Sequence, residues 1–107
     1  MSLDVSLYAV RCTEIFDANI THNLGPMAKE AGIYHHVWRP EEIGITHAAQ
    51  LIEPLAIAIA TMKADPGRFR ALEPENKWGT YDNFVPWLER YHEACVGNPD
   101  AEVRADR

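Results

Sequence analysis

The sequence predicts a small α+β domain, in which an antiparallel sheet of two or three strands is covered by three to four helices. Three observations lead to this class. The chain starts with two segments that read as strands, its middle carries apolar residues at helical spacing, and its end alternates small apolar and charged residues. With 107 residues, 47% hydrophobic and 24% charged, the chain has the size and composition of a single domain over residues 1–107.

The N-terminal strands are expected at Asp4–Val10 and Thr13–Ala18. In the first, Val5 and Leu7 recur at every second position, which is typical of a half-buried strand. A last strand is expected at Ala101–Ala105, where the apolar residues are small. Such a strand is marginal alone, so we expect it to pair with one of the N-terminal strands.

The first helix is expected to begin just after Asn23, because asparagine is a favoured N-cap residue. Pro26 falls in the first turn, where its missing N–H costs nothing, and Gly32 is expected to end the helix. Ile33–Trp38 continues as a short apolar and aromatic segment, which Arg39-Pro40 interrupts.

The clearest helix is expected from Ala48 to Met62, with Thr46 as its N-cap. A short helix should open at Asp65-Pro66 and run through Leu72. A last helix should begin at Thr80 or Asp82 and stop at Gly97-Asn98-Pro99.

Charge and composition exclude several classes of function. The net charge of −6, with no run of Lys or Arg, argues against nucleic-acid binding. The longest apolar stretch, Leu55–Ala60, is too short to cross a membrane, and no signal peptide is recognisable, so we expect a cytoplasmic protein. Cys12 and Cys95 have no metal-ligand spacing and are expected to be free thiols.

Four polar side chains are concentrated in Asn19–Asn23, where the second strand should give way to the first helix. Free backbone N–H groups at such a junction can meet a ligand, and Asn19, Thr21 and His22 would add donors and acceptors. The alternative is structural: Asn23 as a cap, His22 on the surface and Thr21 as a strand-end hydroxyl. The two interpretations carry equal weight.

Two further segments combine an aromatic residue with polar groups. Trp38-Arg39 could offer a stacking face and a charged fork, although a core Trp38 and a surface ion pair from Arg39 is the simpler reading. Trp78-Gly79-Thr80-Tyr81 precedes the last helix, and it could instead be an apolar contact with a turn. If the three segments converge, they predict a ligand site. Its residues would be Asn19, Thr21, His22, Asn23, Trp38, Arg39, Trp78 and Tyr81.

No cofactor is predicted, and the histidine spacing does not favour a metal site. His35 and His36 are adjacent and so point apart, while His22, His47 and His92 are isolated. No catalytic triad is recognisable. The sequence favours a non-enzymatic protein without deciding the point.

The stretch Asn19–Tyr34, followed by Trp38–Glu42, and the stretch Trp78–Tyr81 ahead of Asn98–Ala101 resemble a family of small uncharacterised phage and prophage proteins. The resemblance covers nearly the whole chain. One departure is Lys77, where the family is associated with glycine. The resemblance implies a phage context, with the host cytosol as the compartment, and supplies no mechanism.

The leading hypothesis is therefore a binding protein for a small polar or anionic molecule, plausibly nucleotide-like. By analogy alone, a phage could use it to sequester a host defence signal. The alternative is an inhibitor that contacts a host or phage enzyme, and a third hypothesis is a small hydrolase or lyase that uses His22. A homo-oligomer is expected in the binding hypotheses, because a small sheet leaves edges uncovered.

Overall fold

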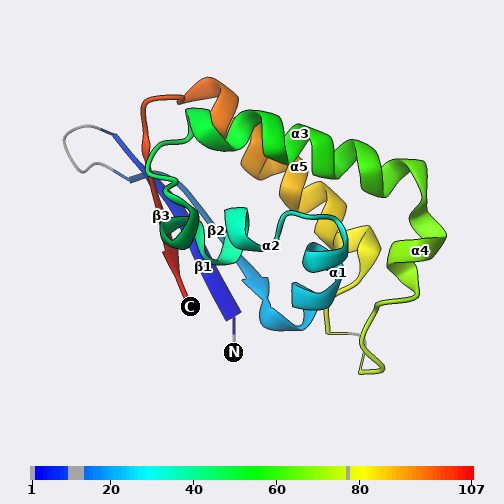
Figure 1. Ribbon diagram of the computed structural model, residues 1–107. Coiled ribbons are helices and arrows are strands. Elements are labelled where there is room, and N and C mark those ends of the chain that lie inside the picture. The colour runs from blue at the N-terminus through cyan, green and yellow to red at the C-terminus, as the bar shows by residue number, and fades with distance from the viewer. Residues whose placement is uncertain (1, 10–13, 77) are drawn as a thin grey trace.

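Three antiparallel strands form a sheet in the order β2–β1–β3 (Figure 1). The computed structural model describes residues 2–9, 14–76 and 78–107. The strands are β1 (Ser2–Tyr8), β2 (Glu14–Thr21) and β3 (Glu102–Asp106). This confirms the α+β class and the pairing of the C-terminal strand with an N-terminal strand.

The helices cover one face of the sheet. Leu3, Val5 and Leu7 of β1 are fully buried, and they alternate with more exposed residues. Ile20 lies opposite Leu3 and Val103 lies opposite Leu7, so all three strands contribute to the same buried face. The alternation that predicted the first strand therefore reflects a sheet with one face in the core.

In the sequence, all the helices of the described chain lie between β2 and β3. Helices α3 and α5 lie side by side, and α1 and α2 lie below both of them in the view of Figure 1. Helix α2 was expected only as a short apolar and aromatic segment. The elements are η1 (His22–Leu24), α1 (Gly25–Glu30), α2 (Tyr34–Trp38), η2 (Pro40–Ile43), α3 (Ala49–Ala64), α4 (Pro66–Arg70) and α5 (Tyr81–Gly97), where η marks a 3₁₀-helix.

The second strand is longer than predicted. It continues past Ala18 to Thr21, because Asn19 and Thr21 pair with Asp4 and Ser2 of β1. Two of the predicted polar site residues, Asn19 and Thr21, therefore lie on a paired strand. The predicted ends of the N-terminal strands at Val10 and Thr13, and the link through Arg11 and Cys12, lie outside the described residues.

The predicted cap at Asn23 is wrong. Asn23 lies inside η1, and its backbone N–H donates to Oγ1 of Thr21 across 3.3 Å, so Thr21 is the capping residue. Helix α1 follows Leu24, which makes no side-chain cap. The predicted end at Gly32 is confirmed: its φ is +76°, and the N–H of Ile33 reaches back to the carbonyl of Ala28 across 3.0 Å.

The predicted cap at Thr46 is also wrong, because a different side chain takes this role. Oε1 of Gln50 accepts the backbone N–H groups of Thr46 at 2.7 Å and His47 at 2.9 Å, and the N-cap position of α3 is Ala48. The last helix was predicted to begin at Thr80 or Asp82, and α5 begins between them, at Tyr81. Thr80 is its N-cap, because its Oγ1 accepts the backbone N–H of Asn83 across 3.2 Å.

Candidate functional site

Gly79 brings the segment before α5 against the end of β2. Its φ is +104°, and a Cβ at this position would lie 2.7 Å from Cγ2 of Thr21 and 2.8 Å from Cγ of Leu24. Only glycine permits so close an approach with this backbone conformation. The backbone N–H of the neighbouring Trp78 donates a hydrogen bond to Oδ1 of Asn76 across 2.9 Å. As a result, Trp78 reaches the Asn19–Asn23 segment.

Trp78 and the Asn19–Asn23 segment line a hollow that we call the polar pocket, with a volume of about 380 Å³. Five of the eight predicted site residues line it, together with one residue that was not predicted. Trp78 exposes 69% of its surface, so its ring remains free to contact another molecule. The lining residues are Ser2, Asn19, Thr21, His22, Asn23 and Trp78.

Asn19 presents its side chain in a fixed orientation. Its Nδ2 donates to Oγ of Ser2 across 2.8 Å and to Oδ1 of Asp4 across 2.6 Å. Its backbone carbonyl accepts the indole N–H of Trp87 across 3.0 Å. Because the amide nitrogen is engaged, Oδ1 of Asn19 is the atom left to accept a hydrogen bond.

His22 is held by a bond from the core. The indole Nε1 of Trp38 donates to Nδ1 of His22 across 2.9 Å. Since Nδ1 must accept this bond, the neutral ring carries its proton on Nε2. His22 therefore offers its Nε2–H as a donor. Trp38 is only 1% exposed, so it orients His22 through this hydrogen bond and offers no stacking face to a ligand.

His22 also lines a second hollow of about 360 Å³, which we call the basic pocket. This hollow contains three cationic side chains in a chain whose net charge is −6. His22 thus connects the two pockets. The lining residues are His22, Gly25, Pro26, Lys29, Tyr34, Trp38, Arg39 and Arg107.

Two of the cations are held by hydrogen bonds. Arg39 donates from Nε to the hydroxyl of Tyr34 at 3.4 Å and forms an ion pair with Glu42 at 2.8 Å. These two partners, Tyr34 first, raise the pKa of Arg39 above its usual value. Arg107 donates to the backbone carbonyl of Trp38 across 2.8 Å and also pairs with Glu41.

Lys29 is the cation with most freedom to meet an anion. Its Nζ lies 4.7 Å from the centre of the Tyr34 ring, a cation–π contact. Within the part of the chain that the structure describes, it has no carboxylate partner. The basic pocket therefore holds one ammonium group whose charge is not neutralised by an ion pair.

Tyr81 does not join the other predicted residues. It is 7% exposed, and its hydroxyl donates to the carbonyl of Met62 across 3.0 Å. Its backbone N–H donates to Glu73 at 2.8 Å. Tyr81 lines neither pocket, so the aromatic faces next to them belong to Trp78 and Tyr34.

The sequence interpretation missed Ser2, Lys29, Tyr34 and Arg107. Lys29 and Tyr34 could have been found, because they follow His22 closely in the sequence. Arg107 could not, since its contact with Trp38 joins residues 69 positions apart. Ser2 enters the pocket through its pairing with Thr21 in the sheet.

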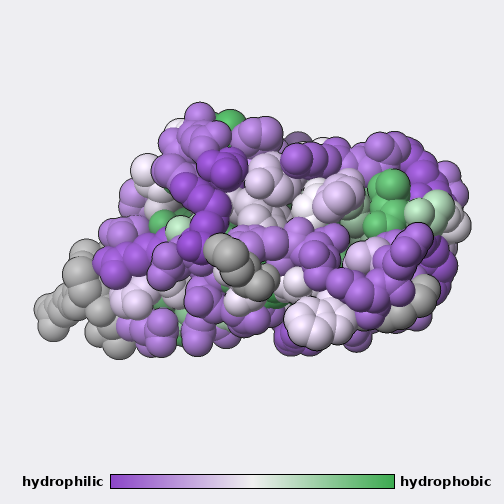
Figure 2. Space-filling model, turned by 90° about the horizontal axis from the view of Figure 1, so that it is seen from below, coloured by the Kyte–Doolittle hydropathy of each residue, from purple (hydrophilic) through white to green (hydrophobic). Residues whose placement is uncertain are grey.

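The polar pocket includes Ser2 at the start of β1, and the basic pocket includes Arg107 just after the end of β3. These two chain ends lie next to one another at the bottom of Figure 1. Seen from below, this side is mostly hydrophilic, with only small hydrophobic areas (Figure 2). Among the described residues, no group of three or more His, Cys, Asp or Glu could hold a metal ion. No helix in the described ranges has the length and apolar character needed to cross a membrane.

Comparisons with protein-family models, with curated proteins and with solved structures found no match for this chain. Any functional conclusion therefore depends on the chemistry of the two pockets.

Proposed function

We propose that this protein binds a small anionic molecule with a planar polar part, such as a nucleotide. The observation that carries the proposal is the position of His22, which lines both the polar and the basic pocket. A molecule that spans His22 would place uncharged polar groups in one pocket and an anion in the other.

In this binding mode, the planar part lies against Trp78 and exchanges hydrogen bonds with Asn19 and Asn23. The anion lies in the basic pocket near Lys29 and Arg107. Hydrogen bonds to charged groups are stronger than neutral ones, so the basic pocket would supply most of the affinity. The neutral amide and hydroxyl groups of the polar pocket would supply the selectivity.

The hydrogen bond from Trp38 favours binding over acid–base catalysis by His22. A general base needs an unprotonated nitrogen directed at the substrate. In the neutral ring of His22, Nδ1 is engaged by Trp38 and Nε2 carries the proton. His22 is therefore arranged to donate a hydrogen bond to a ligand, which supports the binding hypothesis over a His22-dependent hydrolase or lyase.

Calorimetric titration and thermal shift test the proposal with four probes: a nucleoside monophosphate, a cyclic nucleotide, the nucleoside and inorganic phosphate. At least one nucleotide should bind and raise the melting temperature. Lys29→Gln should weaken binding about tenfold, the loss of one charge-assisted contact. Trp78→Ala should weaken binding of the nucleotide and leave that of phosphate unchanged.

Lys63→Gln is the matched control, because Lys63 pairs with Glu89 and lines neither pocket. Its affinity should equal that of the wild type. Absence of binding by every probe, or an equal loss in Lys29→Gln and Lys63→Gln, would contradict the proposal.

The exposure of Trp78 favours a second function, inhibition of a host or phage enzyme by surface contact. Exposed tryptophan is a frequent anchor of protein interfaces. Pull-down from host lysate distinguishes the two. A stoichiometric protein partner retained by Lys29→Gln and lost by Trp78→Ala would favour the inhibitor, whereas a small-molecule site requires both residues.

A further inference from the structure

Two further hollows continue the basic pocket beyond Lys29 and Tyr34. The first, which we call the histidine pocket, has a volume of about 440 Å³. It shares Lys29 and Tyr34 with the basic pocket, so the two hollows are neighbours. Its lining residues are Lys29, Gly32, Tyr34, His35, His36 and Ile43.

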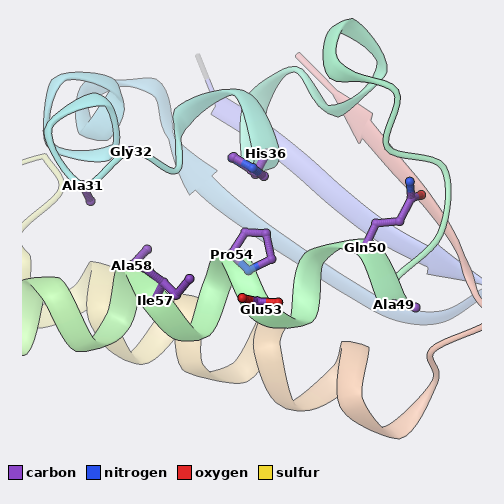
Figure 3. A pocket seen from close by; sticks show the side chains of 9 residues that line it. All are labelled: Ala31, Gly32, His36, Ala49, Gln50, Glu53, Pro54, Ile57 and Ala58. Carbon is purple, nitrogen blue, oxygen red and sulfur yellow. The ribbon is translucent and has the colours of Figure 1, made fainter.

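The second hollow lies between α2 and α3, and we call it the helix pocket. Its volume is about 560 Å³. In Figure 3, Gly32 and His36 lie on one side of this hollow, and Pro54, Ile57 and Ala58 of α3 lie on the other. Gly32 and His36 also line the histidine pocket, so the helix pocket continues it.

The polar, basic, histidine and helix pockets therefore follow one another along one groove. His22 joins the polar and basic pockets. Lys29 and Tyr34 join the basic and histidine pockets, and Gly32 and His36 join the histidine and helix pockets. A molecule bound in the basic pocket can therefore extend in two directions, toward the polar pocket and toward the helix pocket.

Lys29 lies at the junction between these two directions. Its Nζ is 4.7 Å from the centre of the Tyr34 ring, and this ring stacks on Trp38 with the ring centres 5.5 Å apart. These contacts keep the ammonium group between the basic and histidine pockets, both of which Lys29 lines. An anion paired with Lys29 can therefore carry one substituent toward His22 and another toward Ile43.

The groove beyond Lys29 exposes apolar side chains. Ile43 in the histidine pocket is 44% exposed, and Ile57 in the helix pocket is 57% exposed. Isoleucine is among the residue types that are most often buried, so two of them along one groove indicate a surface that another molecule covers. Pro54 and Ala58 extend the apolar wall of the helix pocket.

The polar groups of the helix pocket do not favour a charged substituent. Oε1 of Gln50 already accepts the backbone N–H groups of Thr46 and His47, and its Nε2 donates to the carbonyl of Gly44 across 3.2 Å. The Glu53 carboxylate is exposed on α3 and would repel a second anion. An uncharged apolar chain, which needs no hydrogen-bond partner, fits this part of the groove.

We propose that the groove binds a nucleotide whose phosphate group carries an apolar chain. This binding mode rests on the proposed function, because it uses the same anion position in the basic pocket. The nucleoside occupies the polar pocket, the phosphate group lies beside Lys29, and the chain passes Ile43 and reaches Ile57. Affinity then grows with the length of the chain, by up to about fourfold for each methylene group that is fully covered.

Methyl, butyl and octyl phosphate test the chain separately from the nucleoside, in titrations followed by NMR and calorimetry. Butyl phosphate should shift the methyl resonances of Ile43, and octyl phosphate should shift those of Ile43 and Ile57. Octyl phosphate, kept below its micelle concentration, should bind about tenfold more tightly than methyl phosphate or better. Octanol, which lacks the anion, should bind more weakly than octyl phosphate.

Ile57→Thr should weaken binding of octyl phosphate about threefold and leave that of methyl phosphate unchanged. Ile43→Thr is a second variant with the same expected difference between the two probes. Lys29→Gln should instead weaken binding of all three phosphates by one common factor. Val96→Thr is the matched control, because Val96 is 51% exposed on α5 and lines none of the four pockets. Circular dichroism checks the folding of each variant.

Two results separate this binding mode from the nucleotide site itself. If a nucleoside monophosphate binds, and octyl phosphate binds no better than methyl phosphate, the chain site is refuted and the nucleotide site is retained. If no nucleoside monophosphate binds, both are refuted. An equal loss of octyl phosphate affinity in Ile57→Thr and Val96→Thr, or no shift at Ile43 and Ile57, would also overturn the chain site.

Discussion

The indole N–H of Trp38 donates to Nδ1 of His22 across 2.9 Å, which joins a core side chain to the residue shared by the polar and basic pockets. Because Trp38 belongs to the core, this bond should contribute both to the free energy of unfolding and to the orientation of His22 in the pockets. It also fixes which nitrogen of His22 faces a ligand as a donor.

We predict that neutral His22 carries its proton on Nε2. Long-range ¹H–¹⁵N spectra at pH 8 should show an unprotonated Nδ1. Trp38→Phe should lower the free energy of unfolding by about 2 kcal/mol, through the lost hydrogen bond and a smaller side chain. A double-mutant cycle with His22→Ala should give a coupling of about 1 kcal/mol. A proton on Nδ1, or additive effects, would show that the bond is not formed.

Gly79→Ala should destabilise the fold and weaken ligand binding at the polar pocket. The positive φ and the contact of the new Cβ with Thr21 and Leu24 together should cost roughly 2–4 kcal/mol. Gly67→Ala is the control, because Gly67 lies in α4 with open space around it. It should be neutral or stabilising by about 0.5–1 kcal/mol. Urea unfolding measures both, and equal effects would refute the close approach of Gly79.

Tyr91→Phe should stabilise the protein. The hydroxyl of Tyr91 is buried without a partner among the described residues, and phenylalanine would keep its ring contacts with Phe16 and Trp87. The gain should reach about 1 kcal/mol, seen as a higher melting temperature. Tyr81→Phe provides the contrast, since it removes the bond to Met62 and should cost about 1 kcal/mol. A loss of stability in Tyr91→Phe would mean that its hydroxyl has a partner.

Burial raises the pKa of the Cys95 thiol to about 12. The folded state therefore keeps this proton up to a higher pH than the unfolded state does. The resulting stabilisation is complete below the unfolded pKa of about 8.5 and is lost as the pH rises through the folded value. Stability measured from pH 8 to 11 should fall less steeply in Cys95→Ala than in the wild type.

The same burial should protect Cys95 from alkylation. In a Cys12→Ser background, iodoacetamide should label Cys95 at pH 8 only as fast as the protein unfolds. Rapid labelling without denaturant would contradict the buried position of this side chain.

The expected homo-oligomer stays a prediction, and β2 is where it can be tested. The outer side of β3 is partly covered, since the N–H of Val103 donates to the carbonyl of Thr46 across 2.9 Å. On β2, Ile15 is 41% exposed. Light scattering should give a multiple of the 12.1 kDa chain mass, and Ile15→Lys should reduce it. A monomer at every concentration would rule out this association.

The fold class could be predicted because it depends on patterns local to each segment. Alternation in β1 and helical spacing in α3 and α5 directly reflect which side chains are buried. The residues that cap the helices could not all be predicted, and the predictions of Asn23 and Thr46 were wrong. Which side chain caps a helix depends on competition between several nearby polar residues. Thr21 and Gln50 are the side chains that accept the free N–H groups.

Part of the site could also be predicted from local patterns in the sequence. Polar residues without an evident structural role, such as Thr21 and His22, do line one hollow with Trp78. Trp38 and Tyr81 are of the right chemical type, but both side chains are buried. Their polar atoms already donate to His22 and to the carbonyl of Met62. The cationic half of the site needs Arg107, which reaches it only through the position of β3 beside β1.

Helix α2 has only five residues, and two of them, Tyr34 and Trp38, line the basic pocket. It is tied at its start by the bond from Ile33 to Ala28 and at its end by the bond from Arg107 to Trp38. A ligand in the basic pocket would therefore contact a segment that is anchored at both ends. Because such a ligand would bind the folded chain and not the unfolded one, its binding would raise the free energy of unfolding.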